Sequence, residues 1–101
     1  MEQLNQTNFK EAIKGKMTLV DFYATWCGPC KMLHPVLEEV EKEAKEIEVK
    51  QIDVDGAPEV SKEYGVMSIP TLILFKNGEE VARNVGFLGK QEIISWINQN
   101  K

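Results

Sequence analysis

The apolar residues of this chain fall into short blocks, separated by polar breaks that contain glycine and proline. The segment 17–24 is apolar at nearly every position, which predicts a central strand buried on both faces. From Cys27 to about Lys45, apolar residues recur at helical spacing: Leu33, Val36, Leu37, Val40 and Ala44. A long helix is therefore expected directly after the most hydrophobic strand.

Two further elements are expected in the first half of the chain. Residues 9–13 carry an apolar stripe at helical spacing, and Asn8 is expected to cap that helix with Glu11 reaching back to it. Residues 49–54 predict a second strand. Val49 is out of phase with Ile52, as in a strand buried on both faces. A first strand near residues 3–5 is only weakly indicated.

The second half predicts a short helix, a hairpin and a closing helix. Pro58 begins the short helix and Gly65 ends it. Residues 71–75 form a strand, and the Asn-Gly pair at 77–78 turns the chain back into an antiparallel strand over 79–85. The closing helix is marked by Ile93, Trp96 and Ile97. Alternating strands and helices that end in a hairpin indicate an α/β protein with a mixed sheet.

Length and charge narrow the class of protein. With 101 residues the chain has room for one domain, residues 1–101. The net charge of −4, with both signs interspersed, does not indicate a nucleic-acid partner. No apolar stretch approaches the roughly 20 residues that a membrane helix needs. The polar start of the chain does not resemble a signal peptide, so we expect a cytoplasmic protein.

Cys27 and Cys30 are the only cysteines, and they lie at the predicted head of the long helix. The helix dipole and the free N–H groups at that end favour a thiolate. A second thiol one turn further on can close an intramolecular disulfide, which is the layout of a dithiol–disulfide exchanger. A static disulfide or two inert buried thiols is the structural alternative. A zinc site with His34 would supply three ligands where structural zinc takes four, so no metal is expected.

The two sulfurs are expected to differ. Cys27 lies at the first, exposed position of the helix and is the candidate nucleophile. Cys30 shares a helical stripe with Leu33 and Leu37, so it should face inward, where burial raises its pKa and keeps it a thiol. Cys30 is therefore the candidate resolving residue.

The segment 21–31, DFYATWCGPCK, resembles the active-site signature of the thioredoxin family. Further matches follow in order along essentially the whole chain, at Pro35, 53–55, 64–66, 69–71, 75–78 and 85–86. The resemblance implies the thioredoxin fold. This is a central mixed five-stranded sheet flanked by four helices, with strand order 1-3-2-4-5 and a C-terminal β-hairpin plus helix.

The resemblance also implies an activity, that of a monomeric protein-disulfide reductase and general dithiol electron donor working through a redox-active Cys27–Cys30 disulfide. In this family a Gly-Pro pair between the cysteines, here Gly28 and Pro29, goes with reductants. The chain has no Gly-rich dinucleotide fingerprint, so no bound cofactor is expected. The implied partners are disulfide-containing client proteins and an NADPH-dependent thioredoxin reductase, which reduces the disulfide from outside.

Asp21 lies within the apolar strand, where a carboxyl group should be desolvated and its pKa raised. The family places this residue beneath the active site as proton acceptor for the second cysteine. Thioredoxins commonly carry a lysine near it on the next strand, but the matching position here is Gln51. Lys50 is one residue away and should point to the opposite face. We therefore expect Asp21 to act as base with a higher pKa than in relatives with the lysine.

The remaining expectations concern client binding. By resemblance the Ile69–Pro70 peptide bond should be cis. Pro70 cannot donate a strand hydrogen bond, which leaves the Ile69 backbone free to pair with an extended client segment. An apolar collar around the sulfurs is expected from Trp26, Gly65, Val66, Met67, Gly86 and Phe87. For Met67 and Phe87 a place in the core is an equal alternative.

Two other functions stay open on the sequence. One is a specialised carrier of the same fold, dedicated to one client or oxidising in direction. The other is a non-catalytic binding subunit that lends its collar to a partner protein.

Overall fold

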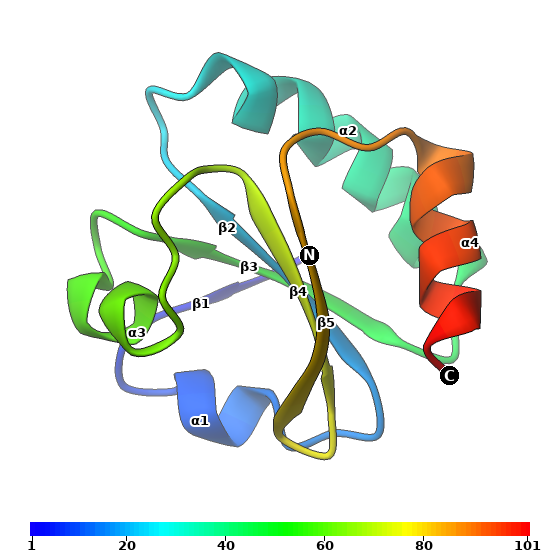
Figure 1. Ribbon diagram of the computed structural model, residues 1–101, viewed down its shortest axis with the longest axis horizontal. Coiled ribbons are helices and arrows are strands. Elements are labelled where there is room, and N and C mark those ends of the chain that lie inside the picture. Colours follow the sequence, from blue (N-terminus) through cyan, green and yellow to red (C-terminus); the bar gives the residue numbers. More distant parts are fainter.

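Five strands form one mixed sheet in the order β1-β3-β2-β4-β5. The computed structural model describes residues 1–101, and Figure 1 shows the elements in chain order. They are β1 (Glu2–Leu4), α1 (Phe9–Ala12), β2 (Thr18–Tyr23), α2 (Gly28–Glu43), β3 (Glu48–Asp53), α3 (Pro58–Glu63), β4 (Thr71–Lys76), β5 (Glu79–Val85) and α4 (Lys90–Gln99). The α/β class, the five strands with four helices and the strand order are confirmed.

Strand β2 lies in the middle of the sheet. It pairs parallel with β3 and antiparallel with β4, so Asp21 faces Gln51 on one side and Leu72 on the other. All of β2 except Tyr23 is buried. The nearly continuous apolar run over 17–24 is thus explained by helices on both faces of the sheet, as a central strand requires.

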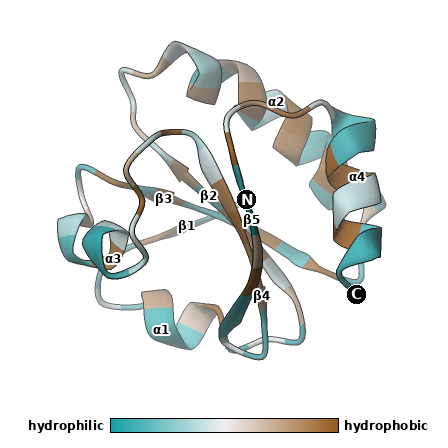
Figure 2. Cartoon of the chain, in the orientation of Figure 1, coloured by the Kyte–Doolittle hydropathy of each residue, from teal (hydrophilic) through white to brown (hydrophobic).

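Helices α2 and α4 cover one face of the sheet, and α1 and α3 cover the other (Figure 1). Figure 2 shows the apolar colouring concentrated on the strands and on the helix faces turned toward them. The α2 and α4 side holds a core of twelve buried residues that includes Leu19, Leu37 and Ile93. The α1 and α3 side holds ten, including Phe9, Phe22 and Phe75. Val49 belongs to the first core and Ile52 to the second, which confirms that β3 is buried on both faces.

The β4–β5 hairpin turns at Asn77 and Gly78, whose φ angles of 54° and 88° are both positive. A two-residue turn of this kind matches the twist of the strands it connects. Further along, Leu74 pairs with Ala82 but Phe75 pairs with Glu80. Val81 is therefore the extra residue of a β-bulge.

The expected cap of α1 is wrong. The Asn8 side chain makes no capping hydrogen bond, because its backbone is already helical (φ −98°, ψ −2°) rather than extended. Instead, the side chain of Asn5 accepts hydrogen bonds from the backbone N–H of Thr7 and of Asn8, both at 2.9 Å. This turn precedes a helix of only four residues.

None of the four helices has the length and apolar character that a membrane crossing requires.

Candidate active site

Cys27 is the N-cap of α2, with an extended backbone (φ −90°, ψ 117°), and Gly28 and Pro29 form the first turn. Cys27 and Cys30 are joined by a disulfide bond, with their Cα atoms 5.2 Å apart. Cys27 Sγ accepts a hydrogen bond from the backbone N–H of Cys30 at 3.2 Å. One of the free N–H groups of the helix N-terminus is thus directed at this sulfur.

The expected difference in exposure between the two cysteines is absent. In the disulfide form Cys27 is 5% exposed and Cys30 is 4% exposed. Both pack with Ala24, and Ile69 covers them from the loop before β4. In this form the two cysteines differ in their place on the helix and in their neighbours, not in their exposure. Cys30 does face inward with Leu33 and Leu37, as expected.

The carboxyl group of Asp21 lies beneath this disulfide in a hollow of about 290 Å³, which Cys30, His34 and Gln51 also line. Asp21 is 1% exposed, and its Oδ1 has no hydrogen-bond partner. Burial raises the pKa of Asp21 to about 7, because the charged form loses its hydration. The desolvated carboxyl group expected from the sequence is confirmed.

Gln51, not Lys50, shares the face of Asp21. The Lys50 Nζ points to the other side of the sheet, where it donates to the Ala12 carbonyl at 3.0 Å and lies 3.2 Å from carboxylate oxygens of Glu2 and Glu48. No ion pair involves Asp21. Lys31 also lines the hollow but makes no ion pair with Asp21, and burial is the cause of the raised pKa of this carboxyl group.

Three of the apolar side chains expected to form the collar lie on the surface. Trp26 is 69% exposed, Met67 is 94% exposed and Phe87 is 45% exposed, so Met67 and Phe87 are surface residues rather than core. The Trp26 Nε1–H donates to Asp55 Oδ2 at 2.8 Å, which fixes the ring's polar edge. Val66 is half-buried and packs on the α1 and α3 core instead.

The loop before β4 approaches the disulfide through Ile69. The Ile69–Pro70 peptide bond is cis, as the resemblance implied. Neither the amide nor the carbonyl of Ile69 takes part in a backbone hydrogen bond. Pro70, in contrast, accepts one from the Gly86 N–H at 2.8 Å, and Gly86 has a positive φ of 102°. The Ile69 backbone is thus left available beside the sulfurs.

Three residues near the site were not singled out from the sequence. Met32 is 65% exposed on the first turns of α2, and a methionine on the polar face of a helix is the signal that identifies it. Asp55 contacts Trp26, and Arg83 holds the start of the loop before β4. Their partners lie far away in the chain, so no local pattern reveals these two contacts.

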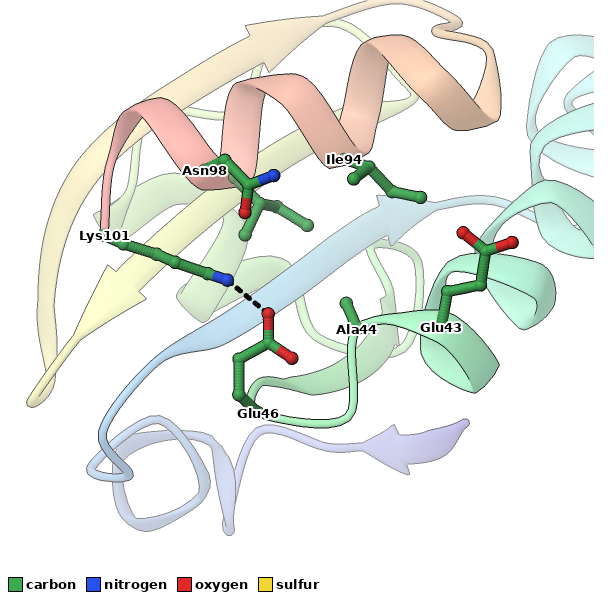
Figure 3. Close-up of a pocket in the computed structure, with 7 residues that line it drawn as sticks. Glu43, Ala44, Glu46, Ile94, Asn98 and Lys101 are labelled. Atoms are coloured by element: carbon green, nitrogen blue, oxygen red, sulfur yellow. Dashed lines mark hydrogen bonds and ion pairs between the residues drawn. The ribbon is translucent and has the colours of Figure 1, made fainter.

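A second hollow lies at the far end of α2, where α4 packs beside it. Figure 3 shows it between Ala44 and Ile94, with Lys101 bonded to Glu46 across its mouth. At 1.5 Å per helical residue, Ala44 is roughly 20 Å along α2 from Cys30. This hollow contains no cysteine or histidine, and no group of three or more His, Cys, Asp or Glu side chains in the protein could hold a metal ion.

A Cys-Gly-Pro-Cys disulfide at a helix N-terminus, above a buried carboxyl group and beside a cis-proline loop, defines a dithiol–disulfide oxidoreductase. Residues 1–99 match the family "Thioredoxin". The chain is 44% identical over 101 residues to thioredoxin of Chlamydia trachomatis, covering 100% of this chain and 99% of that protein. It is 50% identical over 93 residues to thioredoxin of Chlamydia caviae, covering 92% and 91% respectively. The chain belongs to the thioredoxin family, and its cysteine pair is the redox-active centre of a protein-disulfide reductase.

Proposed function

We propose that Cys27 is the attacking thiol and Cys30 the resolving thiol of a reductase that serves as a general electron donor to disulfide-containing proteins. The Cys27 thiolate attacks one sulfur of the client disulfide and forms a mixed disulfide, and the other client sulfur leaves as a thiolate. Cys30 then gives up its proton and attacks Cys27 Sγ, which releases the second client sulfur. Two electrons pass to the client and the Cys27–Cys30 disulfide is formed.

The observation that carries this assignment is the hydrogen bond from the Cys30 N–H to Cys27 Sγ. When the disulfide is open, a donor aimed at one sulfur and the positive end of the α2 dipole lower the pKa of the Cys27 thiol. Cys30 lies inside the helix with its backbone N–H already directed away from its own sulfur. The first thiol is therefore ionised before the second.

Asp21 is proposed as the proton acceptor for Cys30. Both groups line one hollow, and the raised pKa of Asp21, about 7, suits a group that takes and returns a proton near neutrality. The hollow is polar on the side of Gln51 and His34 and large enough for water, so the proton can pass directly or through water.

Client binding is proposed to use the surface around the disulfide. Trp26, Met67 and Phe87 offer exposed apolar area, and Gly86 offers an open backbone where a Cβ would meet nothing within 4 Å. The unpaired N–H and C=O of Ile69 can hydrogen-bond to an extended client segment in the manner of an added strand. A client cysteine would then be presented to Cys27 in a fixed orientation.

We further propose that residues 1–101 form one domain and that the protein acts as a cytoplasmic monomer without a bound cofactor. An NADPH-dependent thioredoxin reductase would restore the dithiol. The match to the thioredoxin family over residues 1–99 supports a single domain. The lack of a dinucleotide fingerprint supports an external source of electrons.

The test is insulin reduction driven by dithiothreitol, comparing the wild type with Cys27→Ser and Cys30→Ser. We expect Cys27→Ser to lose activity and Cys30→Ser to accumulate covalent adducts with the client, because its first step is intact and its second is blocked. Full turnover by Cys27→Ser would show that the roles are assigned wrongly.

A further inference from the structure

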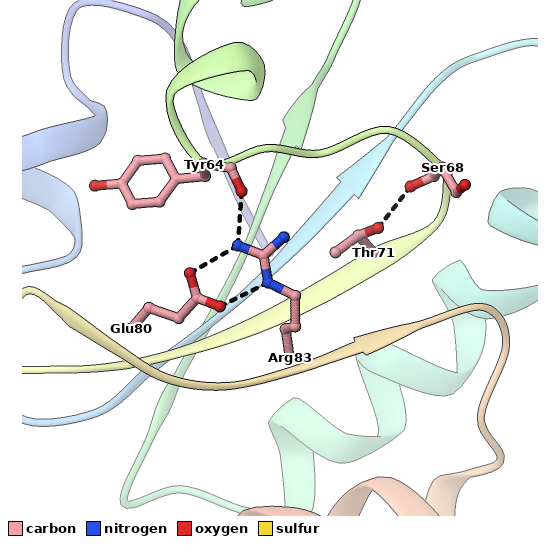
Figure 4. Close-up of polar contacts among 5 residues, drawn as sticks. All are labelled: Tyr64, Ser68, Thr71, Glu80 and Arg83. Carbon is pink, nitrogen blue, oxygen red and sulfur yellow. Dashed lines mark hydrogen bonds and ion pairs between the residues drawn. The ribbon is translucent and has the colours of Figure 1, made fainter.

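Arg83, the only arginine in the chain, connects β5 to the loop that carries Met67 and Ile69. Its Nη2 donates to the backbone carbonyl of Tyr64 at 2.6 Å. The same guanidinium binds Glu80 through two hydrogen bonds, from Nε at 2.6 Å and from Nη2 at 2.7 Å. Figure 4 shows the guanidinium between the Glu80 carboxylate and the Tyr64 carbonyl, with the tyrosine ring turned away.

The β-bulge at Val81 makes this arrangement possible. Residues three apart in a regular strand point to opposite faces of the sheet. The extra residue between Glu80 and Arg83 restores the same face to both, because Glu80 pairs with Phe75 and Arg83 pairs with Ile73. Phe75 and Ile73 both belong to the core beneath α1 and α3. The bulge thus lets the carboxylate orient the guanidinium toward the end of α3.

The carbonyl that Arg83 binds lies at the start of the client-binding loop, residues 65–69. Tyr64 is the C-cap of α3, where carbonyl groups have no partner within the helix. The far end of the loop is held separately, by the Thr71 hydroxyl donating to the Ser68 carbonyl at 2.5 Å (Figure 4). Met67, which is almost fully exposed, lies between the two anchored carbonyls. Ile69, with its unpaired backbone, lies within the turn that Thr71 closes on Ser68.

We propose that Arg83 is a positioning residue for client binding, and that the Glu80–Arg83 pair holds the loop 65–69 in the orientation that a client segment recognises. This inference rests on the proposed use of that loop. It assigns no chemistry to Arg83, which touches neither sulfur. A loop fixed before binding loses less conformational freedom when the client docks.

A guanidinium suits this role and an ammonium does not. Its planar fork can donate to both oxygens of one carboxylate and still direct an N–H at a carbonyl. A lysine at this position would carry all of its donors on one nitrogen at the end of a flexible stem, so it cannot reproduce the two parallel hydrogen bonds to Glu80 that fix the direction of the group. Arg83→Lys should therefore keep the positive charge but hold the loop 65–69 less firmly in its orientation.

The test compares KM and kcat for a peptide disulfide with the rate of reduction of a small aromatic disulfide, which reaches the sulfurs without occupying the loop. For Arg83→Met we expect KM for the peptide to rise roughly five- to tenfold, the size of one lost hydrogen bond. The kcat and the small-disulfide rate should stay within about twofold. Arg83→Lys and Glu80→Gln should give intermediate KM values. Lys90→Met is the matched control, because it removes one positive charge and the ion pair with Glu43 on another part of the surface.

Amide hydrogen exchange supplies a readout independent of activity. The amides of Gly65 and Val66 donate to the carbonyls of Lys62 and Ser61. Their exchange should be faster in Arg83→Met and Glu80→Gln, and unchanged in Lys90→Met. Unchanged exchange and an unchanged KM in Arg83→Met would overturn the proposal, as would an equal loss with both substrates. If Arg83→Met does not fold, the same criteria apply to Arg83→Lys and Glu80→Gln. A wild-type protein that reduces neither substrate would instead contradict the proposed function. The exchange measurement would still show whether Arg83 holds the loop, because it does not depend on activity.

Discussion

Asp21 and Gln51 stand directly opposite one another on the parallel strands β2 and β3, and both line the hollow beside Cys30. The lysine on β3 next to Gln51, Lys50, faces the other side of the sheet. The buried carboxyl group is consequently neighboured by a neutral amide. The residue at position 51 should therefore affect the pKa of the Asp21 carboxyl group.

Gln51→Lys should lower the pKa of Asp21 from its value of about 7, because a facing ammonium group favours the carboxylate. Titration of the Asp21 carboxyl carbon by NMR measures the change. Gln51→Met is the matched control, since it has similar length and no charge and should leave the pKa at or above the wild-type value. A wild-type value below that of free aspartic acid would contradict the burial argument itself.

Asp21 should make the protein less stable as pH rises. Its pKa is 3.8 ordinarily and about 7 when folded, so between these values the folded state binds more protons than the unfolded state. Below about pH 4 the titration of Asp21 does not change the free energy of unfolding. Between about pH 4 and pH 7 this free energy falls as pH rises, and above pH 7 the decrease due to Asp21 is complete. At about 1.4 kcal/mol for each pH unit, that loss is about 4 kcal/mol, as an upper figure.

Asp21→Asn removes this titration. Urea unfolding should find the variant more stable than the wild type at pH 8, by up to about 4 kcal/mol, with the difference vanishing near pH 4. Glu79→Gln, on an exposed position of β5, serves as control and should show no such trend. If Asp21→Asn and the wild type differed in stability by the same amount at both pH values, Asp21 would be excluded as the source of the pH dependence.

The same substitution should separate the two chemical steps. In Asp21→Asn the attack of Cys27 on a client disulfide should proceed normally, while resolution by Cys30 slows by roughly a hundredfold because its general base is lost. Rapid acid quenching resolves the formation and decay of the mixed disulfide. Equal slowing of both steps would mean that Asp21 acts on the fold of the site and not on the proton of Cys30.

The hydrogen bond between Trp26 and Asp55 should hold the exposed indole ring for client contact. Asp55→Ala should raise KM for a peptide disulfide about two- to fivefold, in line with the loss of one surface hydrogen bond. In a Trp96→Phe background Trp26 is the only tryptophan, and its fluorescence anisotropy should fall when Asp55 is replaced. Unchanged anisotropy would show that packing, not this bond, orients the ring.

Features with local causes were predictable from the sequence. The helix start at Cys27, with Gly28 and Pro29 in its first turn, follows from residue types that favour helix N-termini. The hairpin follows from Asn77 and Gly78, which tolerate positive φ. The buried environment of Asp21 follows from the apolar run around it. Each of these depends on neighbours within a few residues.

Features that depend on distant partners were not predictable. Cys27 and Cys30 are buried in a cluster against which Ile69 and Val54 pack from other parts of the chain. The hydrogen bond from Trp26 to Asp55 likewise joins two loops that are 29 residues apart in the chain. The Val81 bulge adds one residue to β5, which no alternation pattern in that exposed strand reveals.

The sequence by itself determined where the redox pair sits, which elements carry it and which family they build, since these follow from short-range periodicity and a contiguous motif. The tertiary structure alone decided what surrounds the pair. It set the exposure of each sulfur and brought Arg83 to the carbonyl of Tyr64. Burial and hydrogen bonding between segments remote in the chain exist only after the sheet has aligned its strands.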